Sequence, residues 1–142
     1  MAEFYPSPIV CSELGKTLEV KFNSLWRGQK IRIDDDFITD KKIAKCDYAV
    51  LLSDKQPKHT LLYIELKGSN LGRAIEQLES TIKILRVHPD FCGYKEKQAH
   101  VVCSKIRIPK TDTSVQKAKD RFLHSYQFIL KCHSQKGIVS LP

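Results

Sequence analysis

The chain has 142 residues and a formal net charge of +8, with 42% apolar and 28% charged residues, six Gly and six Pro. This composition is typical of a folded globular protein and excludes collagen-like, low-complexity and strongly disordered classes. At this length we expect a single domain over residues 1–142. Because no apolar stretch approaches the roughly 18 residues of a membrane span, and no targeting pattern opens the chain, we expect a cytoplasmic protein that does not contact membranes.

The positive charge is concentrated in the second half of the sequence. Residues 1–85 carry 13 basic and 12 acidic side chains, whereas residues 86–142 carry 11 and 4. A basic surface attracts polyanions by releasing their condensed counterions. A solvated, solubilising face would carry the same charge, so the charge alone favours neither reading.

The five cysteines form no CxxC pair, and their number is odd, which argues against a disulfide framework. Buried, reduced thiols are the favoured interpretation. The less favoured alternative is a zinc site drawn from Cys92, His100, Cys103, Cys132 and His133, although their spacing matches no standard zinc pattern.

Hydrophobic spacing predicts the elements in chain order. Residues 11–26 place Cys11, Leu14, Leu18 and Phe22 at helical spacing, although Gly15 and the off-face Val20 weaken that prediction. A strand follows at 30–36, and it ends in the acidic run 34–36. Two β-rich runs at 46–52 and 61–67, joined by a turn that contains Pro57, predict an antiparallel hairpin.

The remaining elements are one strong helix and three shorter segments. A stripe with a 3.6-residue period begins at Leu71, after a capping Ser or Asn, and must stop near Val87 because Pro89 follows. A strand is expected at 98–106, a helix at 114–128, and a terminal strand at 129–141 that is broken at the SQKG turn. The order predicts an α/β fold with helices packed on a central mixed sheet.

Three ionisable side chains interrupt the hairpin. Glu65 and Lys67 are two positions apart on one strand, so they share a face. If Leu51 pairs with Leu61, Asp47 lies opposite Glu65, and a shift of two residues would place Asp47 opposite Lys67. Charges in so apolar a strand require a partner or a ligand.

Two carboxylates on neighbouring strands are the oxygen ligands that Mg²⁺ prefers, and a nearby lysine could orient an attacking water or stabilise a pentavalent phosphate. Asp34, Asp35 and Asp36 compete with Asp47 for the first ligand position. The alternative without a metal is a cross-strand ion pair between Lys67 and one carboxylate, which would leave the second carboxylate unexplained.

Asp47, followed after seventeen residues by Glu65-Leu66-Lys67 and then by an amphipathic helix, resembles the PD-(D/E)xK nuclease superfamily, with Cys46 standing where the motif has Pro. The resemblance implies a restriction-endonuclease-like core of helix, three strands, helix and strand over residues 10–108, with a C-terminal helix and strand beyond it. It implies that Asp47 and Glu65 are metal ligands and that Lys67 is the catalytic lysine.

Auxiliary residues follow from the same resemblance. On the helix after the ExK strand, Gln77 could orient a water at the metal and Arg73 could contact phosphate; both could equally be solvated helix residues. On the first predicted helix, Glu19 is the preferred additional metal ligand, and Glu13 is the second choice.

The sequence therefore predicts a Mg²⁺-dependent nuclease, with Mn²⁺ as a substitute. The resemblance favours DNA over RNA as the substrate, and a homodimer or a partner protein is expected to help in targeting. The alternative is a catalytically inactive member of the fold that binds nucleic acid or a protein. The expected phosphate contacts beyond Arg73 are the basic side chains Lys105, Arg107, Lys110, Lys117, Lys119 and Arg121.

Overall fold

A computed structural model describes residues 4–54, 58–68, 70–104 and 113–141, except for the side chains at 35, 36, 67 and 68. Residues 105–112, which include the predicted phosphate contacts Lys105, Arg107 and Lys110, lie outside the described part. No helix in that part is long and apolar enough to cross a membrane.

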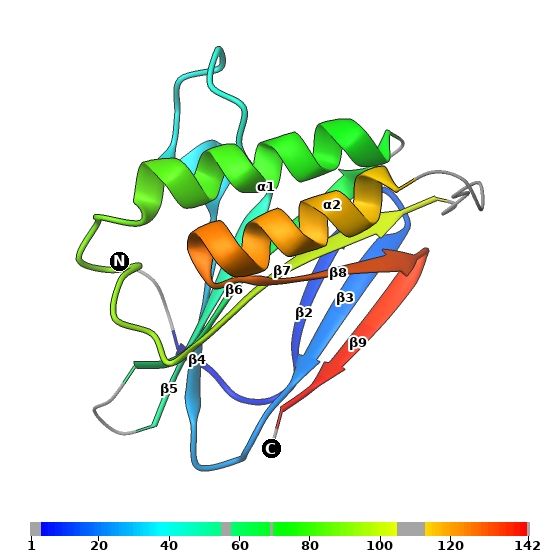
Figure 1. The fold of residues 1–142 in the computed structure, drawn as a ribbon. Helices are drawn as coiled ribbons and strands as arrows, with labels where there is room; N and C mark the ends of the chain where they lie inside the picture. The colour runs from blue at the N-terminus through cyan, green and yellow to red at the C-terminus, as the bar shows by residue number, and fades with distance from the viewer. Residues whose placement is uncertain (1–3, 55–57, 69, 105–112, 142) are drawn as a thin grey trace.

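The chain forms an α/β fold of three layers (Figure 1). The strands are β1 (Phe4–Tyr5), β2 (Ile9–Glu13), β3 (Lys16–Lys21), β4 (Arg27–Arg32), β5 (Tyr48–Ser53), β6 (Lys58–Gly68), β7 (Glu96–Cys103), β8 (Ile129–Ser134) and β9 (Lys136–Ser140). The helices are α1 (Leu71–Leu85) and α2 (Ser114–Arg121), with π-helical turns η1 (Ile33–Phe37) and η2 (Phe122–Tyr126).

The central sheet is mixed, in the order β1-β4-β5-β6-β7-β8. Strands β4, β5 and β6 form an antiparallel meander, whereas β7 and β8 each run parallel to the strand before them in the sheet. The connections into β7 and β8 pass through α1 and through α2 with η2, because parallel neighbours need a crossover. Both helices lie on one face of this sheet, and the smaller sheet β2-β3-β9 covers the other face (Figure 1).

The two faces of the sheet bury separate cores, which explains the continuous apolar runs in β5 and β6. Leu61 and Tyr63 pack beneath the helices, whereas Leu62, Ile64 and Leu66 pack against the smaller sheet. Strands β5 and β6 are therefore apolar on both faces and offer few positions to polar side chains.

The helix expected over residues 11–26 is wrong, so the predicted order fails at its first element. The segment forms the hairpin β2–β3, in which Cys11, Leu18 and Val20 are buried at alternating positions. Leu14 and Gly15 form its two-residue turn, with φ of 48° and 80°. Val20 lies off the apolar face of the predicted helix because it points inward from a strand.

The later elements agree with the predictions more closely. The hairpin β5–β6 and helix α1 are confirmed, and the terminal strand is interrupted, as expected, where Gln135 adopts φ 63°. The helix expected over 114–128 divides into α2 and η2, after which Gln127, at φ 59°, turns the chain into β8. The strand predicted at 30–36 ends at Arg32, because η1 replaces its acidic end.

Candidate active site

Asp47 lies immediately before β5, and its backbone joins two neighbouring segments. Its N–H donates to the carbonyl of Ile64 at 3.1 Å, and its carbonyl accepts from the N–H of Ile33 at 2.9 Å. Its side chain, 3% exposed, accepts a hydrogen bond through Oδ2 from the N–H of Leu66 at 2.9 Å. Asp47 is therefore held by the strand that carries Glu65.

Glu65 lies in β6 and is 1% exposed. Leu51 pairs with Leu61, which confirms the first of the two predicted registers, and the pairing continues to Tyr48 with Ile64. The predicted pairing of Asp47 with Glu65 does not follow, because the N–H of Asp47 donates to the carbonyl of Ile64, a residue that is already paired with Tyr48, so the register breaks at Asp47. Glu65 belongs to the face of the sheet that α1 covers, because Ile64 and Leu66 pack in the other core, and Asp47 lines the same cavity as Glu65.

The two carboxylates line a cleft of about 520 Å³ between α1 and the segment 39–46, here called the lysine loop. In Figure 1 this loop projects past α1. The cleft is lined by Asp34, Lys41, Lys42, Ile43, Ala44, Lys45, Asp47, Glu65, Asn70, Arg73 and Gln77.

Helix α1 holds the base of the lysine loop through two polar side chains. The hydroxyl of Thr81, which is fully buried, accepts from the N–H of Cys46 at 2.9 Å and donates to the carbonyl of Gln77 at 2.8 Å. The side-chain amide of Gln77 donates to the carbonyl of Lys45 at 3.1 Å. These bonds fix the two residues before Asp47, so α1 positions one of the carboxylates.

Charge is divided within the cleft between acidic and basic residues. Asp34, Asp47 and Glu65 line it together with four cations, of which Lys41, Lys42 and Arg73 are exposed and Lys45 is half-buried. The acidic pair also affects its neighbour: burial, together with the charges of Glu65 and Asp47, raises the pKa of the Cys46 thiol. This thiol therefore stays protonated and donates to the carbonyl of Tyr48.

The structure brings four of the predicted site residues together. Asp47, Glu65, Arg73 and Gln77 all line the cleft. Lys67 belongs to β6, but its side chain lies outside the described part of the chain. The amide of Gln77 is bonded to the lysine loop, so its position in the structure is that of a support for that loop.

The additional carboxylates expected from a first helix are elsewhere. Glu19 is on β3, where it pairs with Val10 and Ile138; these neighbours are 42% and 61% exposed, so all three form the outer face of the smaller sheet. Glu13 forms an ion pair with Arg32 at 3.2 Å. Neither glutamate lines the cleft. The placement of Glu19 beside the metal ligands was wrong because it depended on the helix that does not form.

One residue of the acidic run 34–36 lines the cleft. Asp34 lines the cleft as well as forming an ion pair with Arg32 at 3.6 Å. The side chains of Asp35 and Asp36 lie outside the described part. Asp34 is therefore a third carboxylate at the cleft, beside Asp47, which the sequence favours over it as the first metal ligand.

The basic residues of α2 do not reach the cleft. Lys117 and Lys119 are exposed on α2, which packs on β8, at the opposite end of the sheet from β4. Arg121 makes two hydrogen bonds to Glu79 of α1, at 2.9 and 3.1 Å, so in this structure it links the two helices, and its phosphate contact stays a prediction. Burial alone would raise the pKa of Glu79, but the bonds from Arg121 and Tyr126 hold it below its usual value.

Sequence reasoning missed the three lysines that line the cleft. A signal was present, because Lys41, Lys42 and Lys45 lie within seven residues before Asp47. Their proximity to Glu65, however, depends on the bonds from Thr81 and Gln77, which no local pattern reveals.

The zinc alternative is not supported. His100 and His133 lie on the face of β7 and β8 that packs against the smaller sheet, whereas Cys103 and Cys132 pack beneath the helices. The two imidazoles share a hydrogen bond, between Nδ1 of His100 and Nε2 of His133, at 2.9 Å. Among the described residues, no group of three or more His, Cys, Asp or Glu side chains is placed to hold a metal ion.

Comparison of the chain with family models, with curated proteins and with solved structures finds no match.

Proposed function

We propose that the protein is a metal-dependent nuclease with a PD-(D/E)xK-type site, acting on DNA. The observation that carries the proposal is that two buried carboxylates, Asp47 just before β5 and Glu65 in β6, line one cleft that also contains exposed lysines. Carboxylates side by side repel each other and lose hydration, so they are costly unless a cation or hydrogen bonds compensate. A cleft that combines such a pair with surrounding cations suits a divalent metal and a phosphodiester.

The donor atoms fit magnesium. Mg²⁺ is commonly held by one or two carboxylates, with waters and substrate phosphates completing its shell, so a two-carboxylate site suits it better than Zn²⁺ or Ca²⁺. Asp47 and Glu65 would hold the ion; Asp34 lines the same cleft, but the three described carboxylates are not grouped closely enough to hold one ion together. When bound, the ion would lower the pKa of a water and neutralise charge developing on the phosphate.

The chain's own residues would bind and orient the substrate. Lys41, Lys42 and Arg73 would attract the phosphate backbone into the cleft. Lys67, two residues after Glu65 in β6, is proposed to orient the attacking water or to stabilise charge on the phosphate. Gln77 would act through the lysine loop, as a positioning residue.

A second candidate function is nucleic-acid binding without cleavage. The cations that line the cleft favour it, because their attraction to phosphate requires neither a metal nor a reaction. The same fold can carry an active or an inactive site.

Cleavage of supercoiled plasmid and of short duplexes, with Mg²⁺, Mn²⁺ or EDTA, separates the two functions. We expect metal-dependent cleavage by the wild type and a loss of roughly a hundredfold or more in Asp47→Asn, Glu65→Gln and Lys67→Ala. Glu19→Gln is the matched control, since this half-buried glutamate lies outside the cleft. Cleavage that survives Glu65→Gln would refute the assigned site, and retention of DNA without cleavage in any metal would favour the binder.

A further inference from the structure

A second cavity, of about 230 Å³, lies near the other end of α1. Arg86 borders it, thirteen residues after Arg73 of the cleft, which corresponds to roughly 20 Å along a helix. Its walls come from β6 and β7, from the end of α1, from the segment between α1 and β7, and from η2 with the turn into β8. Aromatic and basic side chains dominate its lining, among them Tyr63, Arg86, Phe91, Lys97, Tyr126 and Phe128.

An aromatic stack forms one wall. Phe91 and Phe128 both stack on Tyr63, with ring centroids 6.1 and 5.6 Å from it and interplanar angles of 29° and 16°. Tyr63 is 1% exposed, and its hydroxyl forms no hydrogen bond within the described part of the chain. Burial raises the pKa of Tyr63, so at neutral pH this hydroxyl is a protonated donor. Because Tyr63 lines the cavity, this hydroxyl is available to bond to a ligand there.

The charge of the cavity selects for anions. Lys97 is half-buried, with its Nζ 5.5 Å from the centre of the Phe128 ring, and Arg86 is exposed at the end of α1. No Asp or Glu is among the described residues that line the cavity. A ligand with an anionic group would therefore meet two cations and no lining carboxylate.

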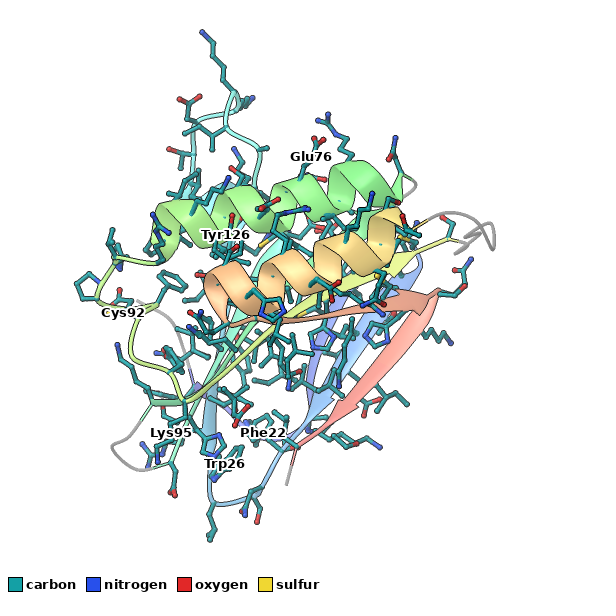
Figure 2. The ribbon with its side chains drawn as sticks, in the orientation of Figure 1. Phe22, Trp26, Glu76, Cys92, Lys95 and Tyr126 are labelled. Atoms are coloured by element: carbon teal, nitrogen blue, oxygen red, sulfur yellow. The ribbon has the colours of Figure 1, made fainter. Side chains whose placement is uncertain are left out.

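The walls are held in place without a ligand. Lys58 donates through its Nζ to the carbonyls of Pro89 and Cys92, which fastens the segment after α1 to β6. On the other side, the hydroxyl of Tyr126 donates to Glu79 of α1 at 2.8 Å. Figure 2 shows Cys92 on the segment that follows α1 and Tyr126 where η2 meets the helices. A preformed cavity avoids the entropic cost of ordering its walls on binding.

We propose that this cavity binds a nucleotide, with the base against the aromatic wall and the phosphate at Arg86 and Lys97. A flat ring suits aromatic surroundings, and Ser125 and Gln127 offer hydrogen-bonding groups to the edge of a base. The volume is slightly below the usual range of small-molecule pockets, so one nucleotide fits better than a longer ligand. The proposal is independent of the nuclease function, because binding at this distance needs neither the metal nor the cleft.

Calorimetric titration of the full chain in EDTA tests the proposal. The ligands are the ribonucleoside and deoxyribonucleoside 5′-monophosphates, a single-stranded trinucleotide and inorganic phosphate. We expect at least one nucleotide to bind about tenfold or more tightly than phosphate. Lys97→Ala should weaken that binding about tenfold, and Tyr63→Phe, which removes only the hydroxyl, should weaken it severalfold. Lys95→Ala is the matched control, since this exposed lysine does not line the cavity.

Comparison of the monophosphates with the trinucleotide shows whether the bound nucleotide is free or part of a nucleic-acid strand. Tighter binding of the trinucleotide identifies a nucleic-acid strand as the source, and tighter binding of a monophosphate identifies a free nucleotide; both support the site if Lys97→Ala weakens them. Absence of saturable binding at millimolar nucleotide would overturn the proposal. So would equal affinities of Lys97→Ala and Lys95→Ala, or phosphate binding as tight as that of every nucleotide. Loss of cleavage in the variants of the cleft would leave these results unaffected.

Discussion

The hydroxyl of Thr81, in the middle of α1, accepts a hydrogen bond from the backbone N–H of Cys46 at 2.9 Å, one residue before Asp47. The same hydroxyl donates to the carbonyl of Gln77, whose amide in turn holds the carbonyl of Lys45. A single helix thus fixes both the approach to a buried carboxylate and the base of the lysine loop. The stability of α1 and the geometry of the cleft are therefore linked.

Thr81→Val removes this hydroxyl while keeping the shape of the side chain. Because the N–H of Cys46 would then be buried without its acceptor, we expect the free energy of unfolding to fall by about 1–3 kcal/mol. We also expect cleavage to slow, since Asp47 loses a neighbour that positions it. Urea unfolding and a cleavage assay on the same preparation measure both effects. Thr81→Ser should restore most of each, and a Thr81→Val protein of wild-type stability would contradict the role of the bond.

Lys41 and Lys42 are expected to provide the salt-dependent part of DNA binding at the cleft. Replacing both with Gln should reduce the slope of log affinity against log salt concentration by up to about 2, because each phosphate contact releases a counterion. Fluorescence anisotropy with a labelled duplex in EDTA measures this slope without cleavage.

The lysines of α2 provide the comparison. The charge distribution of the sequence predicts that Lys117→Gln with Lys119→Gln lowers the slope by a similar amount. Their position on the helix that packs on β8 leads us to expect a smaller change. A larger change from this pair than from Lys41 and Lys42 would move the DNA-binding surface from the cleft to α2.

A buried histidine should make stability fall in mildly acidic solution. His100 is fully buried between Gln98 and His133, and burial, with the charges of His133 and Lys131, lowers its pKa to about 3. The unfolded chain takes up a proton near pH 6.5, whereas the folded chain does not until about pH 3. Stability is therefore complete above pH 6.5 and decreases as the pH falls, by roughly 2 kcal/mol between pH 7.5 and 5.

Denaturant unfolding at a series of pH values measures this decrease. His100→Gln should flatten the dependence, and His124→Gln, which changes an exposed histidine on η2, should leave it as in the wild type. A His100→Gln protein with the full pH dependence would assign the effect to other groups. The pKa of His133 is lowered as well, by burial and by Lys131, so a smaller slope is expected to remain.

Local patterns were sufficient to predict the central elements. The apolar stripe of α1, with Asn70 as its cap, is a property of neighbouring residues, and the structure retains it from Leu71 to Leu85. The register of β5 with β6 was narrowed to two choices because an odd shift would have scattered the charged side chains. The first of those choices is the one observed, with Leu51 paired to Leu61.

The errors arose where the decisive contacts are distant in sequence. The hairpin β2–β3 is stabilised by packing against the central sheet and by β9, so Leu18 and Val20 owe their burial to residues more than a hundred positions away. Arg121 is paired with Glu79, forty-two residues earlier, which charge counting could not reveal. Sequence periodicity identifies an apolar face, but it does not identify the segment that covers it.

Binding of Mn²⁺, followed by calorimetry together with electron paramagnetic resonance, tests most directly whether Asp47 and Glu65 hold a divalent ion. We expect the wild type and Glu19→Gln to bind the ion with the same affinity, and Asp47→Asn and Glu65→Gln each to weaken it at least about tenfold, since each removes one of two charged ligands. Circular dichroism would verify that the variants are folded. Wild-type affinity in both carboxylate variants, or no binding by the wild-type protein, would contradict the proposed metal site.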